Sequence, residues 1–102
     1  MNREKALVLL RDHKAELRSA GVESLSIFGS VARGDETQLS DIDVVMRLTP
    51  EARQDGFAYF GRLEDLTRRL EEILGCSVDL IAEPVRKDRL RENIAREATL
   101  AF

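Results

Sequence analysis

The sequence predicts one small α+β domain, in which a mixed β-sheet of three to four strands is packed with helices. Segments with helical spacing of apolar residues alternate with short apolar runs that are typical of strands. At 102 residues, the chain is long enough for one hydrophobic core but leaves little room for a second lobe. No repeats, low-complexity tracts or linkers interrupt it. Residues 1–102 are therefore expected to form a single domain.

Apolar periodicity and turn residues place each element along the chain. The first helix is expected over residues 3–20, with Gly21 after its last turn, and the longest over 57–74, ended by Gly75. Runs rich in apolar and β-branched residues predict strands at 22–28, 41–46 and 77–82. A short helix is expected at 30–33, a basic helix at 86–98, and a short edge strand or simple packing at 100–102. Residues 51–56 are the least regular, and we interpret them as a loop over the mouth of an active site.

Composition and charge narrow the class of protein. The formal net charge of −3 argues against general nucleic-acid binding, and we expect no sequence-specific contact with nucleic acid. The single cysteine, Cys76, cannot form an internal disulfide. Neither an export signal nor an apolar run of about 18 residues is present, so a cytoplasmic protein without membrane association is expected.

The stretch from Gly29 to Asp43, GSVARGDETQLSDID, carries the clearest chemical signal. If Asp41, Ile42 and Asp43 open a strand, alternation places both carboxylates on one face and Ile42 on the other. Two anions on one small patch repel each other unless cations lie between them. A pair of Mg²⁺ ions is a familiar solution in phosphoryl and nucleotidyl transfer. The spacing therefore predicts a metal site at the start of this strand.

Two further features complete the predicted site. Gly29 allows a backbone to approach a phosphate closely, and Ser30 can begin a short helix whose N–H groups attract anions. Asp79 lies between Val78 and Leu80 in an apolar strand, where an acid is unfavourable unless it has a partner or a function. If the strands at 41–46 and 77–82 are neighbours in a favourable register, Asp79 joins Asp41 and Asp43.

These residues resemble the signature of the polymerase-β-like nucleotidyltransferases: Gly-Ser, ten residues, Asp-x-Asp, then an acid on a later strand. The likeness extends over nearly the whole chain to the minimal nucleotidyltransferase (MNT) domain. It implies that Asp41, Asp43 and Asp79 are catalytic and bind two Mg²⁺ ions, with hard oxygen ligands suited to that metal. It also implies that Gly29 and Ser30 hold the β- and γ-phosphates. Arg33, close to the Gly-Ser turn, is expected to neutralise phosphate charge.

The resemblance also implies a function and a partner. MNT proteins are commonly antitoxins of a HEPN-domain toxin, and transfer AMP from ATP to a tyrosine of that toxin. We therefore expect a Mg²⁺-dependent protein adenylyltransferase with ATP as donor, working in a hetero-oligomer with a HEPN protein. Two other functions stay open. One is a non-catalytic antitoxin that neutralises its partner by binding, and the other is nucleotidyl transfer to a small molecule or a nucleic-acid end.

Simpler structural roles stay open for several of these residues. Asp41 and Asp43 could form a helix-cap or turn pair, and Asp79 could be a buried acid paired with an arginine. His13 and Cys76 are expected to pack at or beside the core. Phe57 and Phe60 are expected in the core, although an interface role is open for these residues and Tyr59. Three roles stay open for the arginines of the last helix: a solvated face, a partner surface or an RNA contact. These arginines are Arg86, Arg89, Arg91 and Arg96.

Overall fold

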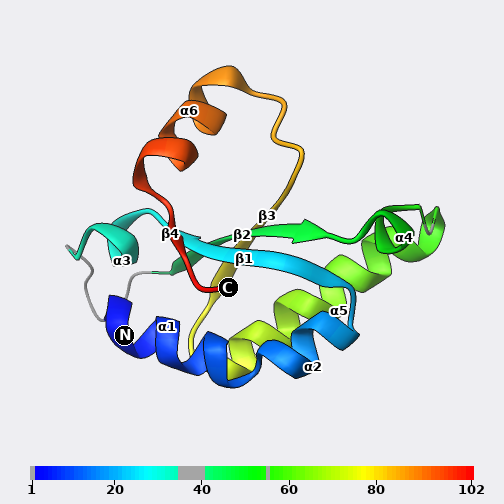
Figure 1. Cartoon of the computed structure of the whole chain (residues 1–102), viewed down its shortest axis with the longest axis horizontal. Helices are drawn as coiled ribbons and strands as arrows, with labels where there is room; N and C mark the ends of the chain where they lie inside the picture. The colour runs from blue at the N-terminus through cyan, green and yellow to red at the C-terminus, as the bar shows by residue number, and fades with distance from the viewer. Residues whose placement is uncertain (1, 35–40, 55) are drawn as a thin grey trace.

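The computed structural model describes residues 2–34, 41–54 and 56–102 and has the predicted α+β fold. Four strands form one mixed sheet in the order β3-β2-β1-β4. Helices α1, α2 and α5 cover one face of this sheet, and α6 lies over the other (Figure 1). The strands are β1 (Val22–Phe28), β2 (Ile42–Leu48), β3 (Val78–Ala82) and β4 (Thr99–Leu100). The helices are α1 (Arg3–Asp12), α2 (Lys14–Ser19), α3 (Ser30–Arg33), α4 (Pro50–Arg53), α5 (Phe57–Leu74) and α6 (Asp88–Glu97).

The register of the sheet determines which strand ends meet. β1 and β2 are antiparallel, with Phe28 opposite Asp43, whereas β2 and β3 are parallel, with Asp43 opposite Asp79. The end of β1 therefore lies beside the beginning of β2, which in turn lies beside the beginning of β3. The expected edge strand is confirmed as β4, which begins at Thr99 and pairs antiparallel with β1.

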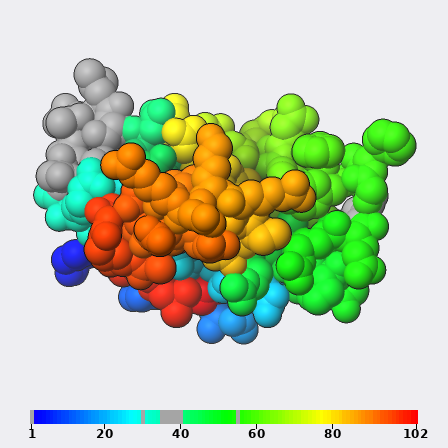
Figure 2. Space-filling view, turned by 90° about the horizontal axis from the view of Figure 1, so that it is seen from above, coloured from blue at the N-terminus to red at the C-terminus, as the bar shows by residue number. Residues whose placement is uncertain are grey.

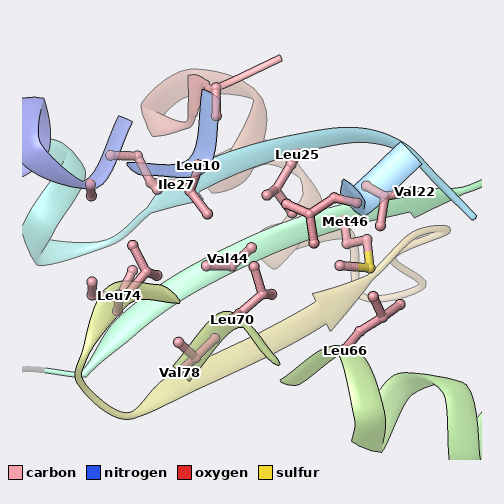
Figure 3. Close-up of a cluster of buried hydrophobic side chains, with 14 of the residues drawn as sticks. Leu10, Val22, Leu25, Ile27, Val44, Met46, Leu66, Leu70, Leu74 and Val78 are labelled. Atoms are coloured by element: carbon pink, nitrogen blue, oxygen red, sulfur yellow. The ribbon is translucent and has the colours of Figure 1, made fainter. Parts of the chain in front are cut away.

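The hydrophobic core lies between the sheet and the α1, α2 and α5 layer (Figure 3). Alternation along the strands sends Ile27, Val44 and Met46 into this layer, and all three are fully buried. From the helices, Leu10 and Leu70 pack against them, also fully buried. Removing this apolar surface from water stabilises the fold by about 25 cal/mol per Å².

The expected first helix is divided into α1 and α2 at His13. The ring Nδ1 of His13 lies 2.8 Å from the carbonyl oxygen of Leu9, and since a carbonyl only accepts, Nδ1–H is the donor. That carbonyl is the one the backbone N–H of His13 would use in a continuous α-helix. The N–H of His13 bonds to Leu10 instead, 3.2 Å away, which tightens and ends α1. His13 is partly buried, close to its expected packed position.

Two further expectations are wrong. The loop expected at residues 51–56 is wrong for residues 51–53, which belong to the short helix α4, capped by Thr49 through Ala52 N. Helix α4 lies at the other end of the sheet from α3 (Figure 1), and residue 55 lies outside the described residues. Phe57 and Phe60 are not in the core, since they are 100% and 72% exposed. They lie in the first turn of α5, before the helix reaches the sheet with Leu66, Leu70 and Leu74.

Candidate active site

The candidate site lies where β1 ends and β2 and β3 begin. Ile42 and Val44 are fully buried in the core, so alternation directs Asp43 between them to the opposite face of the sheet. Val78 is buried on the same core side, which places Asp79 on the same face as Asp43. The strand order and register thus bring residues 36 positions apart to neighbouring places on one surface.

Gly29 lies directly against the carboxylate of Asp43. Its φ of +80° is in the left-handed region, where a side chain adds strain. A Cβ built at this position would overlap the Oδ2 atom of Asp43. Glycine is therefore needed here both for the turn from β1 into α3 and for the close approach of the backbone to the acid.

The carboxylates influence one another. Burial raises the pKa of Asp43 above its usual value, and the negative charges of Asp79 and Asp41 raise it further. The positive charge of Arg33 acts in the opposite direction. A bound cation would stabilise the charged form of an acid that is partly buried and has two other acids near it.

Two of the simpler roles considered for the acids do not fit this geometry. Asp43 lies inside β2, so it does not cap a helix, whereas a turn role for Asp41 involves residues 35–40, which lie outside the described residues. Asp79 is exposed, and the ion pairs of the described residues do not include it, so it is not a buried acid paired with an arginine.

The donor set suits magnesium. In residues 2–34, 41–54 and 56–102, no three acidic, histidine or cysteine side chains are already grouped closely enough to enclose a metal ion. The carboxylates of Asp41 and Asp79 are exposed, however, and rotation of exposed side chains can bring them toward Asp43. Carboxylate oxygens are hard ligands of the type that Mg²⁺ prefers, so the chemistry of Asp41, Asp43 and Asp79 fits this ion.

Helix α3 connects the site to α6. Arg33 at the end of α3 forms an ion pair with Glu97 in the last turn of α6, with 3.2 Å between Nη1 and Oε2. Seen from above, α6 covers the middle of the sheet face opposite α1, α2 and α5, and α3 lies at one end of that face (Figure 2). Sequence reasoning missed Glu97, because residues 64 positions apart share no local pattern. The side chain of Ser30 and residues 35–40 lie outside the described residues, so the predicted phosphate contact of Ser30 stays a prediction.

A mixed sheet of this order, with a glycine turn and paired aspartates where the strands meet, agrees with the nucleotidyltransferase class that the sequence resembles. The chain belongs to the nucleotidyltransferase domain family, whose model matches residues 10–101. The resemblance to minimal nucleotidyltransferases is thereby confirmed.

Relatives of similar length support this assignment. The chain is 40% identical over 76 residues to a proposed protein adenylyltransferase of Methanocaldococcus jannaschii, covering 74% of this chain and 72% of the relative. It is 30% identical over 90 residues to the protein adenylyltransferase MntA of Thermococcus cleftensis, covering 87% of this chain and 85% of the relative.

Solved structures share the fold. A minimal nucleotidyltransferase structure superposes with a TM-score of 0.74 and 31% identity, covering 97% of this chain and 95% of the other. The complex of a tri-AMPylated HEPN toxin of Shewanella oneidensis with its MNT antitoxin superposes with a TM-score of 0.61 at 18% identity, covering 94% and 71%. At that identity the likeness concerns the fold alone. Within the described part of the chain, no helix is long and apolar enough to span a membrane.

Proposed function

We propose that this protein is a Mg²⁺-dependent adenylyltransferase that transfers AMP from ATP to a tyrosine of a HEPN toxin, and so acts as its antitoxin in the cytoplasm. The observation that carries this proposal is the pairing of Asp43 with Asp79 on one sheet face, beside the backbone of Gly29. The relatives that are named protein adenylyltransferases support the choice of a protein acceptor.

Each predicted site residue has a role in this proposal. Asp41, Asp43 and Asp79 would hold two Mg²⁺ ions, which supply positive charge to the triphosphate and make the acceptor hydroxyl more acidic. Gly29 and Ser30 would lie against the β- and γ-phosphates through backbone N–H groups. Arg33, whose charge already acts on Asp43, would offset phosphate charge beside them.

The transfer is a single in-line displacement. The acceptor oxygen forms a bond to the α-phosphorus of ATP, the bond from that phosphorus to the bridging oxygen of the β-phosphate breaks, and pyrophosphate leaves. The proton of the hydroxyl passes to Asp79. This carboxylate suits the role because it is exposed, and an acceptor brought by another protein can reach it.

A HEPN protein as acceptor is supported by fold neighbours. Toxin–antitoxin complexes, one of them with the ATP analogue AMP-PNP, superpose on the chain with TM-scores of 0.64 and 0.65 at 20% and 22% identity. In this proposal the antitoxin silences the toxin by covalent modification within a hetero-oligomer.

The proposal is tested with the protein encoded by the adjacent gene as acceptor. The purified chain, this acceptor, Mg²⁺ and one of ATP, CTP, GTP or UTP are incubated together, and the acceptor is weighed by intact mass spectrometry. We expect an increase of one or more adenylyl groups with ATP, no increase without Mg²⁺, and none with Asp41→Asn or Asp43→Asn. Asp12→Asn is the matched control, because Asp12 is an exposed acid at the end of α1, on the other face of the sheet from Asp43 and Asp79.

The same assay separates the other functions considered above. Continued inhibition of the toxin without any mass increase would overturn the proposed catalysis in favour of neutralisation by binding. Labelled nucleotide transferred without the protein acceptor would indicate a small molecule or nucleic-acid end as the substrate.

A further inference from the structure

The outer edge of β3 is an unpaired sheet edge. In the order β3-β2-β1-β4, β3 is an end strand, and its other side pairs with β2. Ile42 N donates to Ser77 O at 3.0 Å, and Glu83 N donates to Met46 O at 2.9 Å. In a parallel ladder the backbone groups of alternate residues face the same neighbour. Odd-numbered residues of β3 therefore bond to β2, and the backbone groups of Val78, Leu80 and Ala82 face outward.

One of these outward groups already has a partner that confirms the direction. Val78 N donates to a carboxylate oxygen of Glu71 on α5 at 3.1 Å. Among the described residues, the N–H groups of Leu80 and Ala82 have no such partner. Unpaired strand edges of this kind are templates for the addition of another extended segment.

A groove of about 410 Å³ with both apolar and charged lining residues lies between α5 and β3, which it meets at Leu80. Phe60, Leu63 and Leu80 line it, and Phe60 is 72% exposed. Sheet edge and groove together match the two requirements of strand addition, which are main-chain hydrogen bonds and a pocket for alternate side chains.

The groove also has a charge preference. Among the described residues that line it, Glu64 and Glu71 are acidic, and the cation Arg68 lies 3.6 Å from Asp65. An extended segment with basic residues is therefore favoured over a neutral or acidic one.

We propose that the outer edge of β3 and this groove bind an extended basic segment of the acceptor protein, which adds to the sheet as a fifth strand. The residue of this segment that carries the acceptor hydroxyl would lie opposite Asp79. This inference rests on the proposed function, because it states how the acceptor of that function binds. Side chains at opposite positions of two paired strands point to the same face of the sheet, and neighbouring strands lie about 4.8 Å apart. A residue opposite Asp79 on the added strand thus points to the same face as Asp79 and Asp43.

The test uses the protein encoded by the adjacent gene as the probe. Hydrogen–deuterium exchange of the chain is followed by NMR with and without this protein, in the absence of nucleotide. We expect the amides of Leu80 and Ala82 to exchange at least about tenfold more slowly in the complex, because they gain hydrogen bonds. The amides of Asp79 and Ile81, which already bond to β2, are the internal reference.

Two pairs of variants test the groove in the transferase assay. Phe60→Ala is expected to raise the KM for the acceptor about tenfold with little change in kcat, because it removes an aromatic anchor. Phe57→Ala is its control, since Phe57 is fully exposed and does not line the groove. Glu64→Lys is expected to raise the KM at low salt, whereas Glu51→Lys, on exposed α4, leaves it unchanged.

The outcomes separate this inference from the proposed function. Adenylylation of the acceptor without protection of Leu80 and Ala82, and with equal KM for Phe60→Ala and Phe57→Ala, would overturn the docking surface and leave the transferase. Protection of the two amides without adenylylation would support the docking surface and overturn the transferase. The absence of both would overturn both.

Discussion

Replacement of Asp43 by asparagine is expected to remove the activity and to stabilise the protein. Burial raises the pKa of Asp43, and the negative charges of Asp79 and Asp41 raise it further. Two unit charges about 5 Å apart, near the separation of neighbouring strands, repel by about 0.8 kcal/mol even at the dielectric constant of water. Asp43→Asn keeps the shape of the side chain and removes this repulsion. We expect the free energy of unfolding to rise by about 1 kcal/mol at pH 7 and low salt.

The pH dependence gives this prediction a clear sign. A carboxyl whose pKa is higher in the folded than in the unfolded state favours folding most below its unfolded pKa, and this contribution is lost as the pH rises through the folded pKa. The difference between wild type and Asp43→Asn should therefore be seen at neutral pH and shrink in acid. Urea unfolding at pH 7 and below pH 4, with and without Mg²⁺, measures it.

Magnesium provides the second readout. Mg²⁺ should stabilise the wild type, since it binds the folded site, and should stabilise Asp43→Asn less. The variant should give no adenylyl transfer. A variant that is less stable than the wild type at neutral pH, or equally stabilised by Mg²⁺, would refute the view that Asp43 belongs to a repulsive, cation-binding group of acids.

Three further predictions concern the turn, the ion pair and the core. Gly29→Ala should remove transferase activity and lower the free energy of unfolding by about 1–3 kcal/mol in urea unfolding, because its Cβ meets Asp43 and its φ is +80°; wild-type activity would contradict this. Glu97→Gln should lower that free energy by less than about 1 kcal/mol, because its partner Arg33 is 46% exposed, and the difference should vanish in high salt; a larger, salt-independent loss would show that the ion pair does not act as a surface pair. Leu70→Ala should cost about 2–5 kcal/mol by calorimetry or urea unfolding, since Leu70 is fully buried; a cost below 1 kcal/mol would place Leu70 outside the core.

Local patterns were sufficient for most of the elements. The long helix was predictable because its apolar residues follow helical spacing up to Gly75, which has the left-handed φ of +72° that ends helices. The division at His13 was not predictable, because it depends on a ring nitrogen bonding to one particular carbonyl. The exposure of Phe57 and Phe60 was also missed, since periodicity does not show where a helix first meets the sheet.

Within the candidate site, the sequence by itself determined which residues lie close along the chain. Gly29, Asp41 and Asp43 could be assigned because strand alternation and the properties of glycine act over a few residues. Only the tertiary structure decided that Asp79 lies opposite Asp43, that Glu97 pairs with Arg33, and that the outer edge of β3 stays open. Strand order and register arise from the packing of the whole core, and no short stretch of sequence contains that information.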